Sequence, residues 1–552
     1  MRLPAPYALA CVGLALSTAA CTLLGEVNPS EEDGGSPTEE SFEPVLAPRL
    51  LEEMDLGDKI GQLMVLTAQG TTAAENAALI ETYRPGGLIY FDANLTGAEQ
   101  IASLSAGVQE IAAEQGAGVP LFLGIDQEQG LVARLPVGTS FPDAMAVGAT
   151  GDTGQAVLRA TTTAAELNAL GINLNYAPVA DVNTDPDNPV IGIRSFGSDP
   201  ALVSEMAVAE AGAYAEAGIV PVVKHFPGHG DTDVDSHTGL PVIDMPRDEW
   251  EAEHLPPFRA AVDAGVDAVM TAHVIMPQLD AGTDPATLSP AIIDGILRGE
   301  LGYDGVVTTD ALNMEGVRQD HTDGEIAVRA LEAGVDQLLM LPDPAAAVAA
   351  ITEAVEQDRL TEERIDESVL RVLVLKERRG VLEADPVDPA AAEAALSDPA
   401  HAEAAQTVAD ASATLVRNES GLLPLAAGAR VRVEGTGADR LAGALAEAGL
   451  EVVTEGADAV VVGTNGARGS AEQSAPVEAA RAQGLPVVVV AQGGPYDLEA
   501  FPGVEGFIAV YSSVDVSLAA AAGVVAGEVE PTGTLPVDIP GADVAAGTGL
   551  GF

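Results

Sequence analysis

A dense group of titratable side chains occupies the stretch from Lys224 to His237, which holds three of the chain's seven histidines, one of its three lysines and three aspartates. The apolar, β-branched segment 218–223 precedes this stretch and predicts a buried strand, while the glycines and the proline of the stretch exclude a continuing helix. Loops at the ends of strands often carry active sites, because a rigid scaffold holds them there. This loop is therefore the first candidate for catalysis.

Asp235 and His237 lie two residues apart in this loop, so their side chains point the same way if the backbone is extended there. A carboxylate bonded to imidazole fixes the tautomer of the ring and raises its basicity, which suits a proton shuttle near neutral pH. Two alternatives stay open. The two residues could form a surface ion pair, or the loop could bind a metal with His225, His229 and Asp231 as further ligands, although the spacing matches no compact zinc pattern.

Asp310 ends an apolar strand candidate within Val306–Met314. Burial at a strand end holds a carboxylate rigidly, as a carboxylate nucleophile requires. The N-cap of a following helix is an equally good interpretation, because aspartate fills that position well. Further donors and acceptors that suit sugar hydroxyls are Asp126, Arg134, Arg194, Lys224 and His225. The two arginines also fit ordinary ion pairs with surface carboxylates.

Short apolar segments alternate with Ala/Leu/Glu-rich helical stretches between residues 48 and 380, which favours parallel βαβ units. The eight strand candidates are residues 60–66, 87–91, 121–125, 172–176, 219–223, 268–272, 305–309 and 337–341. This number of parallel strands predicts a (β/α)8 barrel, with an open, doubly wound sheet as the alternative. The polar residues directly after these strands are Asp126, Lys224, His225, His273 and Asp310. The face of a barrel at the carboxyl ends of its strands would collect them all.

A second domain is predicted at residues 401–552, after a connector at 381–400 that is rich in proline, aspartate and alanine. Its strand candidates are 431–434, 459–463, 487–491 and 507–511, and its helical stretches include 440–448 and 516–526. This alternation predicts an α/β sandwich of three layers. A glycine turn at 492–496 could approach a ligand, but it is interpreted as structural.

The composition indicates a large, strongly acidic protein. At 552 residues and 47% hydrophobic residues, the chain is long enough for more than one core. Its 84 acidic residues against 25 basic ones argue against nucleic acid as a partner, because a phosphate backbone requires a basic face. The acidic excess is interpreted as a solvated surface.

The first 21 residues have the features of an export signal, with Arg2 near the start, an apolar run, and small residues before Cys21. They resemble a bacterial lipoprotein signal, which predicts lipid on Cys21 and removal of Cys11, so that no cysteine pair is left for a disulfide. Thr18 departs from the aliphatic residue usual at its position. Cleavage at an ordinary signal site, with secretion, is therefore the alternative.

Residues 22–47 are acidic and lack an apolar period, which predicts a flexible tether. No later apolar run is long enough to span a membrane. The lipid is then the predicted attachment, at the outer face of the cytoplasmic membrane.

A series of short motifs runs from about Leu51 to the C-terminus. They are Asp58–Met64, Ile125–Glu128, Val190–Gly197, the loop Lys224–His237, Thr271–Val274, Thr309–Leu312, Pro495–Leu498 and Pro531–Val537. With these motifs in this order, the chain resembles glycoside hydrolase family 3, in particular its β-N-acetylglucosaminidase branch. The long histidine-containing loop is the most specific of them.

The resemblance implies a retaining double displacement that releases terminal N-acetylglucosamine from cell-wall fragments or chitin oligomers. Asp310 would be the nucleophile, and His237, oriented by Asp235, the general acid and base. The family positions that hold the sugar match Asp126, Arg134, Arg194, Lys224 and His225. His229 and Asp231 are then assigned to loop architecture. We expect a monomer without cofactor or metal.

Three other functions stay open. A histidine in place of a second carboxylate puts no further anion beside the nucleophile and so tolerates phosphate as the acceptor, which makes a β-N-acetylglucosaminide phosphorylase the first alternative. A β-glucosidase is the second. A sugar-binding lipoprotein without catalysis is the third, and retention of Asp310, Asp235 and His237 argues against it.

One departure from the family concerns the turn after Glu128, where two glycines are usual and this chain has Gln129 and Gly130. We expect the side chain of Gln129 to alter the turn or to narrow the pocket.

Overall fold

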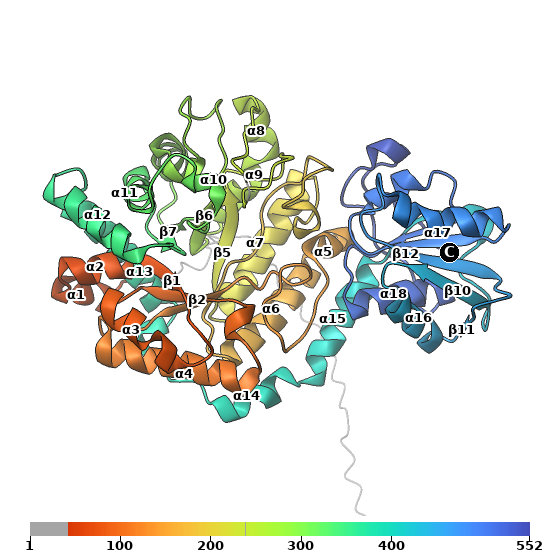
Figure 1. The fold of residues 1–552 in the computed structure, drawn as a ribbon, viewed down its shortest axis with the longest axis horizontal. Helices are drawn as coiled ribbons and strands as arrows, with labels where there is room; N and C mark the ends of the chain where they lie inside the picture. The colour runs from red at the N-terminus through yellow and green to blue at the C-terminus, as the bar shows by residue number, and fades with distance from the viewer. Residues whose placement is uncertain (1–41, 238) are drawn as a thin grey trace, which may run out of the picture. The chain divides into compact units, whose positions relative to one another are not determined.

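The computed structural model describes residues 42–237 and 239–552 of the chain (Figure 1). The predicted signal segment with Cys21, and the predicted tether up to residue 41, lie outside the described residues. Helix α1 (Leu46–Glu53) begins within the last residues predicted as tether. Among the described residues, no helix has the length and apolar character needed to cross a membrane.

Eight parallel strands form the first sheet, in the spatial order β7-β6-β5-β4-β3-β2-β1-β8. They are β1 (Met64–Thr67), β2 (Gly87–Tyr90), β3 (Phe122–Ile125), β4 (Leu174–Asn175), β5 (Val220–Phe226), β6 (Ala268–Thr271), β7 (Val306–Thr308) and β8 (Leu338–Leu339). A parallel bridge between Thr308 and Gln337 links the two ends of this order, so the sheet nearly closes on itself. The predicted (β/α)8 barrel is confirmed, and the doubly wound alternative is wrong.

Helices follow the strands along the chain and surround the barrel (Figure 1). They are α2 (Leu56–Gln62), α3 (Ala73–Tyr83), α4 (Ala98–Gln115), α5 (Ala144–Thr150), α6 (Thr153–Ala169), α7 (Pro200–Glu216), α8 (Arg247–Glu253), α9 (Leu255–Asp263), η4 (Ala291–Glu300), α10 (Glu315–Arg318), α11 (Asp323–Ala333), α12 (Pro344–Glu356) and α13 (Glu362–Arg378).

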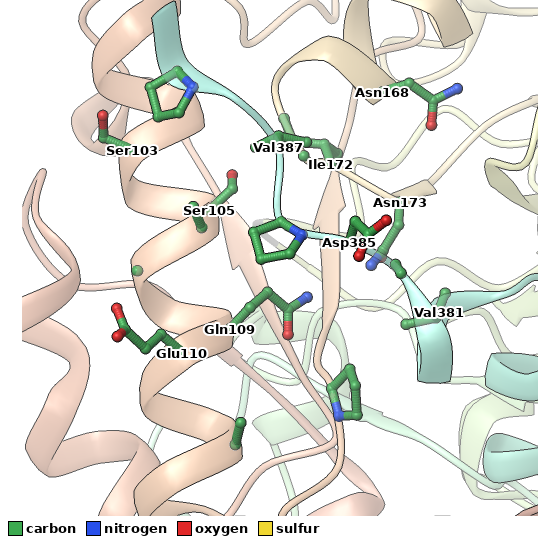
Figure 2. A pocket seen from close by; sticks show the side chains of 18 residues that line it. Ser103, Ser105, Gln109, Glu110, Asn168, Ile172, Asn173, Val381, Asp385 and Val387 are labelled. Atoms are coloured by element: carbon green, nitrogen blue, oxygen red, sulfur yellow. The ribbon is translucent and has the colours of Figure 1, made fainter.

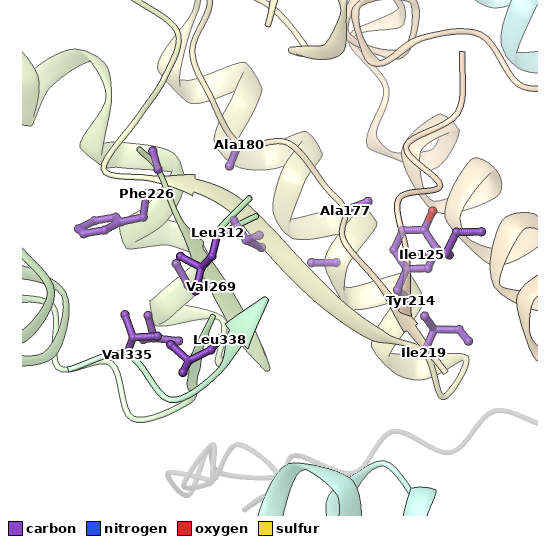
Figure 3. Packing of buried hydrophobic residues seen from close by; sticks show 14 of the residues in the cluster. Ile125, Ala177, Ala180, Tyr214, Ile219, Phe226, Val269, Leu312, Val335 and Leu338 are labelled. Atoms are coloured by element: carbon purple, nitrogen blue, oxygen red, sulfur yellow. The ribbon is translucent and has the colours of Figure 1, made fainter. Parts of the chain in front are cut away.

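Barrel strand residues divide between two buried clusters. The inner cluster contains at least one residue from each of the eight strands, for example Val222 of β5 and Phe122 of β3. Val223, which follows Val222 in β5, belongs to the outer cluster, which packs under the helices. Figure 3 shows part of that outer cluster, including Phe226, Val269 and Leu338. Successive side chains of a strand point to opposite faces, so strands covered on both sides must be apolar throughout.

Two predicted strands differ from the observed ones by three or more residues at one end. The prediction for residues 60–66 is wrong over its first part, because α2 occupies it. Asp55 begins that helix by accepting a hydrogen bond from the Asp58 amide at 2.8 Å, while the Asp58 carboxylate accepts one from Asp55. In β5 the strand continues to Phe226, so Lys224 and His225 lie inside the strand and not after it.

The second sheet has six strands in the order β11-β10-β12-β13-β14-β9. They are β9 (Thr414–Asn418), β10 (Arg430–Gly435), β11 (Glu451–Val452), β12 (Ala459–Thr464), β13 (Val487–Ala491) and β14 (Gly506–Ala509), with helices α16 (Ala438–Glu447), α17 (Ala471–Ala482) and α18 (Asp515–Ala526). Alternate residues of β12 belong to different clusters, Val460 and Val462 to one and Val461 to the other. Both faces of the sheet are therefore covered, and the predicted three-layer sandwich is confirmed.

The segment predicted as a connector is largely helical. It contains α14 (Pro389–Leu396) and the start of α15 (Pro399–Ser412), and aspartates Asp388 and Asp398 cap the two helices. Helix α14 packs against α4 and α6, where Ala392 is buried.

Candidate active site

A cavity of about 320 Å³ collects the predicted site residues at the carboxyl ends of the barrel strands. The predicted residues that line it are Asp126, Arg134, Arg194, Lys224, His225, His237 and Asp310, and Glu128, His229, Ser236 and Phe91 join them. Asp235 is not part of the lining but contacts His237. The prediction that one barrel face gathers these side chains is thus correct.

Asp310 follows the last residue of β7 by two positions, and its Oδ1 accepts a hydrogen bond from the Ala311 amide at 2.7 Å. The next helix, α10, begins only at Glu315, so the N-cap interpretation is wrong. Burial on its own raises the pKa of Asp310, but the His273 and His225 imidazoles and the Ala311 amide outweigh it and lower the pKa. The carboxylate is therefore ionised near neutral pH.

Asp235 and His237 are brought together as predicted. Their Oδ1 and Nδ1 atoms lie 2.8 Å apart, and the His237 amide donates to the same oxygen at 2.8 Å. The imidazole is 61% exposed, whereas its ring also faces the cavity that holds Asp310. Burial on its own raises the pKa of Asp235, but the amide and the ring of His237 have the larger effect, so the net shift lowers the pKa. The carboxylate therefore stays charged beside the ring.

Glu128 is a site residue that the sequence interpretation missed. It accepts two hydrogen bonds from Arg194, each at 2.8 Å, and forms a 2.6 Å ion pair with Lys224. Lys224 also donates to Asp126 at 2.8 Å. Burial would raise the pKa of Glu128, but the two cations lower it strongly. Arg194, whose side chain is 11% exposed, is accordingly a largely buried member of this network, and its interpretation as an ordinary surface partner is wrong.

Asp181 is a second residue that the sequence interpretation missed, and its carboxylate contacts the His225 ring. Its Oδ2 lies 2.6 Å from His225 Nδ1, and its Oδ1 accepts the His229 amide at 2.7 Å. Asp181 is fully buried, yet the neighbouring imidazoles lower its pKa against the effect of burial. A carboxylate on Nδ1 sets the orientation of the His225 ring and leaves Nε2 for other contacts.

His229 lines the cavity, and its hydrogen-bond partner belongs to the same loop, which agrees with its assignment to loop architecture. Its Nε2 lies 2.9 Å from Ser236 Oγ. Asp231 instead accepts a hydrogen bond from Thr184 at 3.1 Å and is not a lining residue, as expected of a loop residue. In the part of the chain that the structure describes, no three His, Cys, Asp or Glu side chains are grouped to hold a metal ion.

Gln129 takes a left-handed backbone conformation, with φ of 72°, where a glycine is usual. Its side chain points away from the cavity, because Nε2 donates to Thr163 at 2.9 Å and Oε1 accepts the Phe141 amide. Gln129 thus adopts a backbone conformation that favours glycine, and its side chain is not part of the cavity lining, so the expected narrowing of the pocket does not occur. Arg134 lies over the Phe91 ring, 5.4 Å from its centre, at the cavity wall.

A larger cavity, of about 830 Å³, lies between α4, the start of β4 and the segment 381–389 (Figure 2). Its lining residues Pro120 and Asn173 precede β3 and β4, so it opens near the amino ends of these strands. The side-chain amide of Gln109 forms hydrogen bonds with the main chain of Leu121, and that of Asn168 donates to the carbonyl oxygen of Ala217. The charged residues that line this cavity are two carboxylates, Glu110 and Asp385, whereas the smaller cavity combines carboxylates with arginine, lysine and histidine.

Comparison with known proteins places these observations in a family. A family model described as the glycosyl hydrolase family 3 N terminal domain matches residues 55–375. Beta-hexosaminidase A of Pseudoalteromonas piscicida is 38% identical over 393 residues, which cover 66% of this chain and 64% of that protein. A beta-N-acetylglucosaminidase/beta-glucosidase of Cellulomonas fimi is 28% identical over 540 residues, which cover 88% of this chain and 94% of that protein. The chain thus matches just under two thirds of the length of the first relative.

Among solved structures, a glycoside hydrolase family 3 beta-N-acetylglucosaminidase from Paenibacillus sp. str. FPU-7 has 39% sequence identity and a TM-score of 0.83. The match covers 88% of this chain and 99% of that one, so it extends over both the barrel and the sandwich domain. The family model alone spans more than half of the sequence. The chain belongs to glycosyl hydrolase family 3.

Proposed function

We propose that the protein is a retaining, exo-acting β-N-acetylglucosaminidase that removes terminal N-acetylglucosamine from cell-wall fragments or chitin oligomers. The observation that carries the proposal is a single small cavity that holds both the ionised Asp310 and the imidazole of His237. The names of the relatives, a hexosaminidase and two N-acetylglucosaminidases, support the choice of sugar.

In the first step, the Asp310 carboxylate attacks the anomeric carbon while His237 gives its proton to the leaving oxygen. A glycosyl-enzyme ester on Asp310 results. In the second step, water passes a proton to His237 and attacks the same carbon, which frees Asp310 and restores the β configuration of the sugar. Asp235 keeps the ring oriented and stabilises it whenever it is protonated.

The remaining cavity residues suit the hydroxyl groups of one sugar. Asp126 supplies an acceptor, while Lys224, Arg194 and Arg134 supply donors, and His225 offers its second ring nitrogen. A volume of about 320 Å³ is near the lower end of the range for small-molecule sites, roughly 300–1,000 Å³. Room for one unit favours cleavage at the end of a chain.

Attachment and assembly are proposed from the sequence alone. Cys21 would carry lipid, and the protein would act as a monomer at the outer face of the cytoplasmic membrane. Labelling with a radioactive fatty acid tests this, since Cys21→Ala should abolish incorporation.

Phosphorolysis is the second candidate, because the proposed acid/base is the histidine His237 and not a second carboxylate that would repel phosphate. Within the cavity, however, Glu128 and Asp126 neutralise Lys224 and Arg194. Both cations are therefore paired before an acceptor arrives, and they leave little net positive charge to attract phosphate. The pairing therefore favours water as the acceptor.

The test compares an aryl N-acetylglucosaminide with the matching aryl glucoside, each with and without phosphate. We expect free N-acetylglucosamine as the product and no dependence of the rate on phosphate. Sugar-1-phosphate as the main product would establish phosphorolysis instead. A preference for the glucoside would favour a β-glucosidase.

A further inference from the structure

The loop that carries Asp235 and His237 needs a contact outside itself to define its position. The hydrogen bond between these two residues orients the imidazole within the loop. Because both partners belong to the same short part of the loop, residues 235–237, this bond leaves the distance from His237 to Asp310 undefined. Proton transfer requires a defined position, since displacements of about 1 Å in such sites cost up to about 100-fold in rate.

Ser236, the residue between them, makes the contacts that meet this need. Its side chain is buried, and its Oγ lies 2.9 Å from Nε2 of His229. Its carbonyl oxygen accepts a hydrogen bond from the Gly316 amide at 3.2 Å. The first contact ties this part of the loop to His229, three residues after the end of β5, and the second ties it to the segment that continues from Asp310.

Gly316 allows the segment after Asp310 to lie close to the backbone of the loop at Ser236 and Gly239. A Cβ atom at this position would lie 2.9 Å from the carbonyl oxygens of both Ser236 and Gly239, and 3.4 Å from Cβ of His273. Such distances to backbone oxygens are too short for a side chain. Only glycine therefore lets the segment after Asp310 rest directly against the loop of His237.

His229 is held firmly enough to serve as an anchor. Its ring is buried, its amide donates to Asp181 at 2.7 Å, and its carbonyl accepts a hydrogen bond from Asn188 at 2.9 Å. Burial also lowers the pKa of His229 to about 4, so the ring is neutral wherever the enzyme is expected to work. The mechanism described above gives this buried imidazole no other task.

We propose that His229, Ser236 and Gly316 form a latch that positions His237 for proton transfer at the bond attacked by Asp310. They are positioning residues, because they act through His237 and not on the substrate. The inference rests on the proposed function and deepens it by explaining how the acid/base loop is held against the nucleophile.

The test uses aryl N-acetylglucosaminides with good and poor leaving groups, because only the poor ones need protonation by His237. For Ser236→Ala and His229→Gln, we expect kcat/KM to fall about 10- to 100-fold with the poor leaving group and less than about threefold with the activated one. Val234→Ala, on an exposed side chain of the same loop, is the control and should change neither value.

A second comparison separates positioning from a general structural effect. In a His237→Ala background, Ser236→Ala should cause less than about a twofold further loss with either substrate, because the group it positions is gone. Gly316→Ala should behave like Ser236→Ala, with Gly212→Ala, whose added methyl meets nothing within 4 Å, as its control.

Equal losses with both leaving groups, no loss from Ser236→Ala, or an undiminished loss in the His237→Ala background would each overturn the latch. These outcomes are distinct from failure of the proposed function, which would appear as full activity of Asp310→Ala or as a different product.

Discussion

Glu128 connects the charged residues of the cavity, since it contacts both Arg194 and Lys224 while almost fully buried. Removing one partner of a buried ion pair is strongly destabilising, because the other partner stays buried and charged without its counterion. The sequence could not single out Glu128 among 84 acidic residues, since its partners come from distant strands and loops. Asp181 was missed for the same reason.

We expect Glu128→Ala to lower the free energy of unfolding by about 3–5 kcal/mol, as measured by urea denaturation, because two buried cations lose their shared partner. The control is Glu251→Ala, which removes an exposed ion pair with Arg247 and should cost less than about 1 kcal/mol. Similar losses from the two substitutions would contradict the role assigned to Glu128.

The residues that sequence reasoning did find share a recognisable position. Asp310 and the strand-end residues Lys224 and His225 follow or end apolar runs, and that pattern depends only on local sequence. The contact of His229 with Ser236 could not be predicted, because folding of an irregular loop brings the two residues together. Local patterns locate a loop but do not define its internal contacts.

At the scale of elements, helix α13 places a lysine against the barrel, and no carboxylate of the described residues forms an ion pair with it. Lys376 is fully buried, donates to Gln62 Oε1 at 3.0 Å, and has its Nζ 5.2 Å from the centre of the Phe122 ring. Burial lowers the pKa of Lys376 from its ordinary value of 10.5 to about 7. Between these values, the unfolded chain binds more protons than the folded one, so stability rises with pH.

We therefore expect Lys376→Met to stabilise the protein most at pH 7 and below. Its advantage over the wild type in urea unfolding should shrink by up to about 1.4 kcal/mol per pH unit between pH 7 and 10. Lys59→Met is the matched control, because ion pairs with Glu362 and Asp366 outweigh burial and raise the pKa of Lys59. A pH-independent difference for Lys376→Met would contradict the account.

The accuracy of the element predictions followed the strength of the local signal. The barrel strands were found because they are apolar on both faces. The start of β1 was misplaced because a capping box at Asp55 continues a helix into an apolar run. The sequence does not predict strands β9 and β11. Strand β11 is only two residues long and both are exposed, and β9 pairs antiparallel at the sheet edge. Helix α17 was not predicted, and it contains Pro476.

At the scale of the whole molecule, the sandwich domain contacts the loop between β4 and α7 that carries Arg194. Ile193 packs against a cluster built largely from the sandwich, while the adjacent Arg194 lines the cavity. Asn183 of the same loop accepts the Gly192 amide at 3.1 Å and donates to the Tyr496 hydroxyl at 3.3 Å. The second domain thus supports one wall of the cavity.

We expect Ile193→Ala to raise KM by up to about 100-fold through displacement of Arg194. In an Arg194→Ala background, the same substitution should have little further effect, which a purely structural loss would not reproduce. Val452→Ala, at an exposed position on β11, is the control. Steady-state kinetics of the four variants provide the measurement, and additive losses would count against this contact.

As the proposed nucleophile of a retaining reaction, Asp310 forms a covalent bond to the sugar. The most direct measurement is mass spectrometry of the protein after reaction with a fluorinated aryl N-acetylglucosaminide, whose glycosyl-enzyme hydrolyses slowly, followed by peptide mapping. We expect one sugar per chain, attached to the peptide that contains Asp310 and absent in Asp310→Ala. A sugar bound to another residue, or turnover of an unmodified substrate by Asp310→Ala, would contradict the account.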